Sequence, residues 1–280
     1  MPSSENYMRS LLLSQPLRQT IMKDIIQSMQ LPAASYGLDL GCGIGLNTTI
    51  LAEALGSDGK IMGLDSNDNL LHKARSLLSK SDVNERISFE TGDARSLPFP
   101  DQSFDWACSI DCVGAIDSDP VLLLKELRRV VKPGGRVFLI IWSSQLLLPG
   151  FPLLEARLNA TSAGIAPFAA DMAPKSHIMR AAGWFKRAGF TDNRAQTFVS
   201  DICPPLSNEI IAAMIDLFTM RWGGIKKEVA PELWHDYQRL CNPDSPDFIL
   251  NIPEYYAFFT YSVFSGHINK KEMGGVYEPD

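Results

Sequence analysis

Between Tyr36 and Ile141 the sequence alternates short apolar runs with amphipathic stretches, and no other feature constrains the fold as much. Amphipathic stretches at 46–55, 70–78 and 121–131 have helical spacing. The apolar runs, predicted as strands, are YGLDLGC (36–42), KIMGLDS (60–66), RISFETGD (86–93), SFDWACSID (103–111) and RVFLIIWSS (136–144). Strand–helix alternation favours parallel pairing with right-handed crossovers, and nearly continuous apolar strands are typical of sheets buried on both faces. We therefore predict a doubly wound, Rossmann-like α/β fold.

Two later segments complete the predicted sheet. After a helical stretch at 178–187, RAQTFVSDI (194–202) is predicted as a strand. YYAFFTYSVFSG (255–266) is apolar on both of its alternating faces, so we expect an interior strand rather than an edge strand. The expected sheet has seven strands and is mostly parallel, with the last strand antiparallel.

Composition limits the possible partners and locations. The net charge is −6, and no Lys/Arg run is dense enough to follow a phosphate backbone, which argues against nucleic-acid binding. The first residues lack a secretory pattern, and no stretch approaches the roughly 18 apolar residues of a membrane span. The five cysteines are odd in number and scattered, so no disulfide framework is expected. We predict a cytoplasmic protein with a small-molecule substrate, and oligomeric state stays open.

A glycine-rich turn, Asp39-Leu40-Gly41-Cys42-Gly43-Ile44-Gly45, separates the first strand from the first helix. Gly41, Gly43 and Gly45 let the backbone turn sharply and let a ligand lie against it. A dinucleotide-binding fingerprint requires its third glycine at position 46, which is Leu46 here. The spacing therefore indicates a ligand-binding turn other than the dinucleotide type.

Polar residues also stand where the next strands end. The second strand ends in Asp65 and Ser66, where a carboxylate can accept both hydroxyls of a ribose. The third strand ends in Gly92-Asp93-Ala94, and the fourth ends in Ser109-Ile110-Asp111. Sheets of this type bind ligands at the carboxyl ends of their strands, so these residues are predicted to share one site.

The ordered series resembles the class I S-adenosylmethionine-dependent methyltransferases over residues 36–142, and more loosely over 179–202. The first turn is similar to motif I of that family, Gly92-Asp93-Ala94 to its adenine-reading segment, Ser109-Ile110-Asp111 to its motif IV region, and Lys132-Pro133-Gly134-Gly135 to a recurrent turn. Among its branches the chain looks most like enzymes that methylate small molecules, including quinone precursors and sterols. Position 109 begins Ser-Ile-Asp-Cys, unlike the Asn-Pro-Pro-Tyr segment of amino-methylating DNA enzymes.

The resemblance implies S-adenosylmethionine as cofactor, S-adenosylhomocysteine as product, and direct methyl transfer to a small, largely apolar acceptor. The implied cofactor-binding residues are Asp39, Gly41, Cys42, Gly43, Gly45, Asp65, Ser66, Gly92, Asp93, Ala94, Ser109 and Asp111. Asp111 and His177 are candidates for a general base, which is needed only if the acceptor must lose a proton. No metal site is expected, because Cys108 is predicted to be a core residue and neither Cys203 nor Cys241 belongs to a CxxC motif.

Domain boundaries are predicted from the same pattern. The predicted parts are an N-terminal helical segment or lid (1–34), the cofactor-binding core (35–142), an insertion or cap rich in Pro, Ala and Gly (143–178), a core helix and strand (179–202), a helical cap (203–252), and the final strand with a tail (253–280).

Two alternative functions stay open. An NAD-dependent oxidoreductase shares an acid at position 65, although Leu46 and Gly92-Asp93-Ala94 argue against it. A non-catalytic module that only holds S-adenosylmethionine requires the same turn and the same acids.

Overall fold

The computed structural model describes residues 4–79, 81–113, 118–162, 175 and 177–270. Within them, seven strands form one sheet in the order β3-β2-β1-β4-β5-β7-β6. The strands are β1 (Tyr36–Leu40), β2 (Lys60–Asp65), β3 (Ile87–Thr91), β4 (Phe104–Ile110), β5 (Val131–Leu146), β6 (Thr191–Ile202) and β7 (Ala257–His267). The predicted seven-stranded Rossmann-like fold is confirmed.

Nine α-helices and four short 3-10 helices accompany the strands in the described residues. The α-helices are α1 (Ser4–Leu13), α2 (Gln15–Ser28), α3 (Leu46–Ala54), α4 (Asp68–Leu78), α5 (Pro120–Val130), α6 (Pro152–Asn159), α7 (Ala181–Arg187), α8 (Asn208–Trp222) and α9 (Pro231–Cys241). The 3-10 helices are η1 (Asn84–Arg86), η4 (Ile178–Arg180), η5 (Ile225–Lys227) and η6 (Ile249–Asn251). None of the described helices combines the length and apolar character required to span a bilayer.

Strand directions follow from the pairing. β1 is parallel to both β2 and β4, and β2–β3 and β4–β5 are parallel as well. Near the start of β5, the N–H of Gly134 donates to the carbonyl of Ile268, just past the end of β7, whereas Ser143 near the end of β5 bonds to Thr260. β7 therefore runs antiparallel to β5 and lies inside the sheet, as its two apolar faces predicted.

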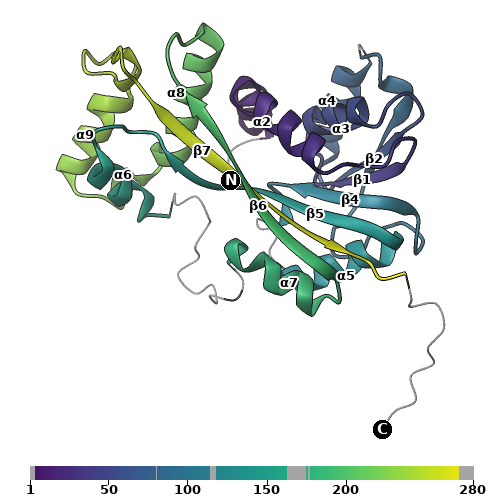
Figure 1. Cartoon of the computed structure of the whole chain (residues 1–280). Coiled ribbons are helices and arrows are strands. Elements are labelled where there is room, and N and C mark those ends of the chain that lie inside the picture. Colours follow the sequence, from purple (N-terminus) through teal and green to yellow (C-terminus); the bar gives the residue numbers. More distant parts are fainter. Residues whose placement is uncertain (1–3, 80, 114–117, 163–174, 176, 271–280) are drawn as a thin grey trace. The chain divides into compact units, whose positions relative to one another are not determined.

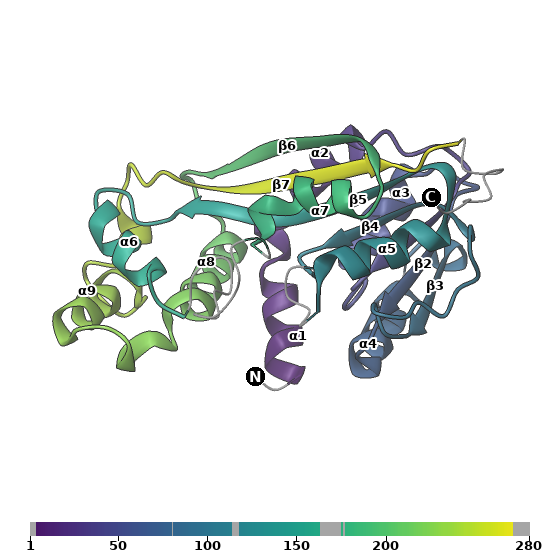
Figure 2. The same ribbon diagram turned by 90° about the horizontal axis from the view of Figure 1, so that it is seen from below.

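The chain divides into two compact units built from non-contiguous segments. Unit 1 comprises 1–24, 142–174 and 197–262, and unit 2 comprises 25–141, 175–196 and 263–280. In unit 2, α3 and α4 lie on one face of the sheet, and α5 and α7 lie on the other (Figures 1 and 2). This doubly wound arrangement buries β1 and β4 between the two helical layers, apart from Tyr36 and Asp105, which are partly exposed.

The core of unit 2 forms where the apolar sides of these helices meet the strands. Leu123, Leu124 and Leu127 of α5 are fully buried, and Trp184 of α7 is 1% exposed. α4 begins at the N-cap Asn67, whose side chain accepts the N–H of Asn69, and only one side of this helix is buried.

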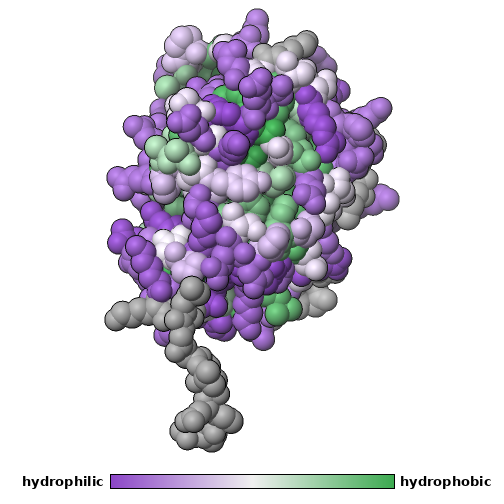
Figure 3. Space-filling model, turned by 90° about the vertical axis from the view of Figure 1, so that its right-hand side faces the viewer, coloured by the Kyte–Doolittle hydropathy of each residue, from purple (hydrophilic) through white to green (hydrophobic). Residues whose placement is uncertain are grey.

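Hydrophilic residues cover most of the face of the molecule drawn in Figure 3, and hydrophobic residues gather near its centre.

Unit 1 has an apolar core of its own. Phe218 and Trp222 of α8 stack at 6.0 Å between ring centroids, and Tyr237 of α9 donates its hydroxyl to the carbonyl of Phe218. The indole N–H of Trp222 donates to Asn159 in α6, and Ser10 in α1 donates to Asp216 in α8. α1 and α6 are thereby held to α8 and α9, which come much later in the sequence.

Candidate cofactor pocket

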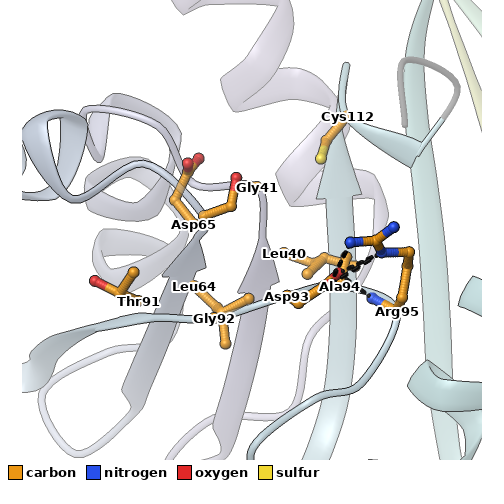
Figure 4. Close-up of a pocket in the computed structure, with 11 residues that line it drawn as sticks. Leu40, Gly41, Leu64, Asp65, Thr91, Gly92, Asp93, Ala94, Arg95 and Cys112 are labelled. Atoms are coloured by element: carbon orange, nitrogen blue, oxygen red, sulfur yellow. Dashed lines mark hydrogen bonds and ion pairs between the residues drawn. The ribbon is translucent and has the colours of Figure 1, made fainter. Parts of the chain in front are cut away.

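A cavity of about 480 Å³ opens at the carboxyl ends of β1, β2 and β3 within unit 2 (Figure 4). Its volume falls within the roughly 300–1,000 Å³ typical of small-molecule sites. It is lined by Leu40, Gly41, Leu64, Asp65, Ser66, Thr91, Gly92, Asp93, Ala94, Arg95 and Cys112. The cavity lies next to the point where the strand order reverses between β1 and β4, which is where open α/β sheets bind ligands.

The glycine turn after β1 is tied to the end of β2. The N–H groups of Gly41 and Cys42 both donate to the carbonyl of Leu64, at 2.7 and 3.1 Å. Gly41 has a φ of 76°, and a Cβ added there would overlap the Sγ of Cys112. Glycine is therefore required at position 41 both for the turn and for the close approach of Cys112.

Asp65 joins the two loops beside the cavity. Its Oδ2 accepts the N–H of Gly43 at 2.9 Å, and its Oδ1 accepts the N–H of Asn67 at 2.9 Å. These bonds fix the plane of the carboxylate, yet each oxygen can accept a further donor. Asp65 is thus a preorganised acceptor at the cavity wall (Figure 4).

Asp93 is paired with Arg95 at the other side of the cavity. The guanidinium donates to both carboxylate oxygens at 2.7–3.0 Å, and the backbone N–H of Arg95 donates to Oδ1 at 2.8 Å. These hydrogen bonds keep the pKa of Asp93 below its usual value, so the carboxylate is ionised at neutral pH. The side chain is therefore held as a hydrogen-bond acceptor.

Asp39 lies behind the glycine turn and is 1% exposed. Its Oδ2 accepts the hydroxyl of Thr48 in α3 at 2.6 Å, and the thiol of Cys108 lies 3.9 Å from Oδ1. Burial raises the pKa of Asp39 to about 6. This carboxylate links β1, α3 and β4, and its predicted contact with the cofactor stays a prediction.

The structure brings six of the predicted cofactor residues to the cavity wall: Gly41, Asp65, Ser66, Gly92, Asp93 and Ala94. The other six are outside the lining set: Asp39, Cys42, Gly43, Gly45, Ser109 and Asp111. Of these, Gly43 contacts Asp65 through its backbone, whereas Cys42 and Ser109 are buried. Asp111, at a φ of 52°, donates its N–H to Ile140 directly after β4.

His177 lies at the start of η4, where its Nδ1 accepts the N–H of Met179 at 3.2 Å. This contact caps the 3-10 helix. Neither His177 nor Asp111 lines the cavity, so both stay only candidates for a general base.

Sequence reasoning missed Thr91, Arg95 and Cys112 as cavity residues. Thr91 donates its hydroxyl to Asp68 at the start of α4, which links β3 to the adjacent helix. Burial, together with the nearby charge of Asp65, raises the pKa of Cys112 to about 12, so its thiol stays protonated. Position alone could have suggested Thr91 and Arg95, because they flank Gly92-Asp93-Ala94.

Comparison with known proteins agrees with this geometry. Residues 38–135 match a family model described as a methyltransferase domain. The chain is 37% identical over 139 residues to a demethylmenaquinone methyltransferase of Lactococcus lactis, covering 50% of this chain and 53% of that protein. It is 39% identical over 129 residues to the Bacillus licheniformis protein of the same name, covering 46% and 53%. The chain spans about half the length of the curated relatives it matches.

Solved structures share the fold at low sequence identity. A Bacillus halodurans C-125 protein, provisionally described as a methyltransferase, aligns with a TM-score of 0.56 and 15% identity, covering 89% of this chain and 98% of that one. A SAM-dependent methyltransferase from Aquifex aeolicus has a TM-score of 0.50 and 18% identity, covering 70% and 92%. The [4+2]-cyclase SpnF has a TM-score of 0.51 and 19% identity, covering 88% and 80%.

The fold, the strand-end cavity and the matched family model define a class of ligand-binding domain, the Rossmann-like methyltransferase domain. Residues 38–135 match a methyltransferase domain, in agreement with the predicted class I S-adenosylmethionine-dependent family and with the predicted cofactor. Neither the NAD-dependent oxidoreductase nor the non-catalytic module finds support in these comparisons.

Proposed function

We propose that the chain transfers the methyl group of S-adenosylmethionine directly to a small, largely apolar acceptor. The observation that carries the proposal is the cavity at three neighbouring strand ends, with one carboxylate, Asp65, beside β2 and another, Asp93, beyond β3. Two fixed acceptors across a nucleoside-sized cavity fit the hydroxyls and the amino group of an adenosyl group. The cofactor-binding residues predicted from the sequence are part of this proposal.

The residues present fit that group chemically. Gly92 and Ala94 present backbone rather than bulky side chains to the cavity, and Gly41 leaves the turn after β1 without a Cβ. Asp65 is held by two backbone N–H groups, so it needs little reorganisation to accept ribose hydroxyls. Arg95 holds Asp93 in the ionised form in which a carboxylate only accepts hydrogen bonds.

When bound, S-adenosylmethionine supplies a methyl group that its sulfonium makes electrophilic. The chain's own task is to bind, orient and exclude water, and orientation can lower a barrier by about 7–11 kcal/mol. Exclusion of water prevents competing reactions. Asp111 or His177 would take part only for an acceptor that must lose a proton, where a base contributes roughly 10²–10⁴-fold.

The acceptor is proposed to be an oxygen-bearing aromatic ring of the quinone or quinol type. The name of the curated relatives supports this choice, since both are demethylmenaquinone methyltransferases. The predicted insertions at 143–178 and 203–252 are proposed to bind the acceptor, and they fall largely in unit 1. Cytoplasmic location and the absence of a nucleic-acid partner stay predictions.

The test is product detection by mass spectrometry with the full chain, S-adenosylmethionine and a panel of quinols, sterols, phenols and amines. The proposal predicts one methyl added to a quinol or phenol and formation of S-adenosylhomocysteine. A thermal-shift comparison with NAD runs in parallel, because a ligand that prefers the folded state raises the melting temperature. Stabilisation by NAD but not by S-adenosylmethionine, or methylation of amines alone, would contradict the proposal.

A further inference from the structure

The part of the sheet that belongs to unit 1 has two chemically different faces. On one face, Trp142 of β5 stacks on Phe259 of β7, with 4.3 Å between ring centroids, and meets Tyr261 edge-on. Successive strand residues point to opposite faces, so Ser143 and Thr260 belong to the other face. One face is thus aromatic and the other carries hydroxyl groups.

The hydroxyl groups bond to one another across three strands. The Oγ of Ser143 lies 2.9 Å from the Oγ1 of Thr260 and accepts the hydroxyl of Ser262 at 2.9 Å. Ser262 also lies 3.0 Å from the hydroxyl of Thr197 in β6. Thr260 and Ser262 are 9% and 3% exposed, Ser143 is half-buried and Thr197 is exposed. The row therefore runs from the interior of the sheet to its edge strand, and its members largely satisfy one another.

Gln145 lies on the same face of β5, two residues beyond Ser143, and it is not satisfied. It is 8% exposed, and among the described residues neither its Nε2 nor its Oε1 has a hydrogen-bond partner. The backbone beyond it is already occupied, because the N–H groups of Leu147 and Leu148 donate to Glu155 and the carbonyl of Leu147 accepts from Tyr255. Burying an amide without hydrogen-bond partners costs free energy. The Nε2 and Oε1 atoms of Gln145 therefore require a partner other than the backbone groups of Leu147 and Leu148.

We propose that Gln145 is part of a binding site in unit 1 for the oxygen of the methyl acceptor, an inference that rests on the function proposed above. The Nε2 of Gln145 donates to a hydroxyl oxygen of the ligand, and its Oε1 accepts from a hydroxyl group. A ring hydroxyl both donates and accepts, so a phenol or quinol matches the two unpaired atoms. The hydroxyl-bearing residues of this face, Ser143, Thr197, Thr260 and Ser262, are all neutral. This favours a neutral ligand over an anion.

The test compares two probes that differ only at the proposed contact, α-naphthol and α-methylnaphthalene. Their dissociation constants are measured by fluorescence titration of the full chain, with saturating S-adenosylhomocysteine present to fill the cofactor pocket. Wild-type protein is expected to bind α-naphthol about tenfold more tightly, the effect of pairing a buried polar group. Gln145→Met, which keeps the length of the side chain without its polar atoms, is expected to reduce this preference to less than about twofold.

Ser144→Ala is the matched control, since Ser144 is the exposed neighbour on the opposite face of β5, and it should keep the preference. Gln145→Asn, which withdraws the amide by one methylene group, provides a second variant if Gln145→Met does not fold. Equal binding of the two probes by wild type, or a preference that survives in the Gln145 variants, would overturn the proposal and leave an ordered water as the partner. If the preference exists and depends on Gln145 but no acceptor is methylated, the proposed function fails, and Gln145 binds a hydroxyl-bearing ligand that is not a methyl acceptor.

Discussion

Asp65 serves the cofactor pocket in two ways, because the carboxylate that would accept a ribose also accepts the N–H groups of Gly43 and Asn67. Asp65→Asn replaces one carboxylate oxygen by an amide nitrogen, which cannot accept a hydrogen bond. One of the two backbone N–H groups therefore loses its acceptor, and the negative charge is lost as well. We expect the affinity for S-adenosylmethionine to fall by at least about 1.5 kcal/mol, or roughly tenfold, in calorimetry. Asp58→Asn, in an exposed turn before β2, is the control and should bind as wild type. Unchanged affinity in the Asp65 variant would show that this carboxylate does not contact the cofactor.

Asp39 gives a prediction about the pH dependence of stability. Its folded-state pKa of about 6 exceeds the ordinary value of 3.8, so the folded chain binds this proton more tightly than the unfolded chain does. The resulting stabilisation is fully present below pH 3.8 and is lost as pH rises through about 6, and it amounts to roughly 3 kcal/mol. Asp39→Asn, whose amide oxygen can still accept from Thr48, should lose this dependence.

The measurement is the free energy of unfolding of wild type and Asp39→Asn at several pH values between 4 and 7, with denaturant at fixed ionic strength. The difference between the two proteins isolates Asp39 from the other titrating groups. We expect the variant to gain stability relative to wild type as pH rises across that range. If the difference in free energy of unfolding between the two proteins stays constant with pH, the pKa of Asp39 is not raised in the folded state.

At the residue scale, a local pattern led the sequence analysis to several residues of the cavity wall, and their contact with the cofactor stays a prediction. Gly41, Asp65 and the Gly92-Asp93-Ala94 segment line the cavity because each follows the end of a parallel strand. Arg95 directly follows this segment, but its pairing with Asp93 does not follow from its residue type. The burial of Gln145 depends on strands 50 and more residues away in the chain, and no local pattern reports it.

Glu155, in α6, connects a helix to the end of a strand. Its carboxylate accepts the N–H groups of Leu147 and Leu148, directly after β5, and it is 4% exposed. Glu155→Ala leaves both N–H groups buried without an acceptor. We therefore expect the free energy of unfolding, measured by urea titration, to fall by at least about 2 kcal/mol. Glu254→Ala removes an exposed carboxylate of the same unit and should change stability by less than about 0.5 kcal/mol. Equal stability of the two variants would contradict the assigned contacts.

Element-level prediction was accurate for long apolar patterns and poor at breaks. β7 was placed inside the sheet because both of its faces are apolar, and it lies between β5 and β6. The predicted N-terminal helical segment (1–34) contains two helices, α1 and α2, separated at Ser14. β5 extends through Leu146, because its partner β7 continues to pair with it beyond Trp142.

At the scale of the whole molecule, the two-unit organisation shows what the sequence alone does not specify. Unit 1 gathers 1–24, 142–174 and 197–262, three segments that no local pattern connects. Their helices bury Phe218 and Trp222 together, and such contacts between distant segments depend on tertiary packing. The predicted roles of lid and cap for these segments stay predictions, whereas the Rossmann-like core was readable from its strand–helix alternation.

The central claim is that the ends of β1, β2 and β3 bind one adenosyl group, and a crystal structure of the full chain with S-adenosylhomocysteine tests it most directly. We expect the ribose hydroxyls to lie on the carboxylate of Asp65, and the adenine edge to lie beside Asp93 and the N–H of Ala94. Density for the compound away from these strand ends, or a ribose that does not contact Asp65, would contradict it.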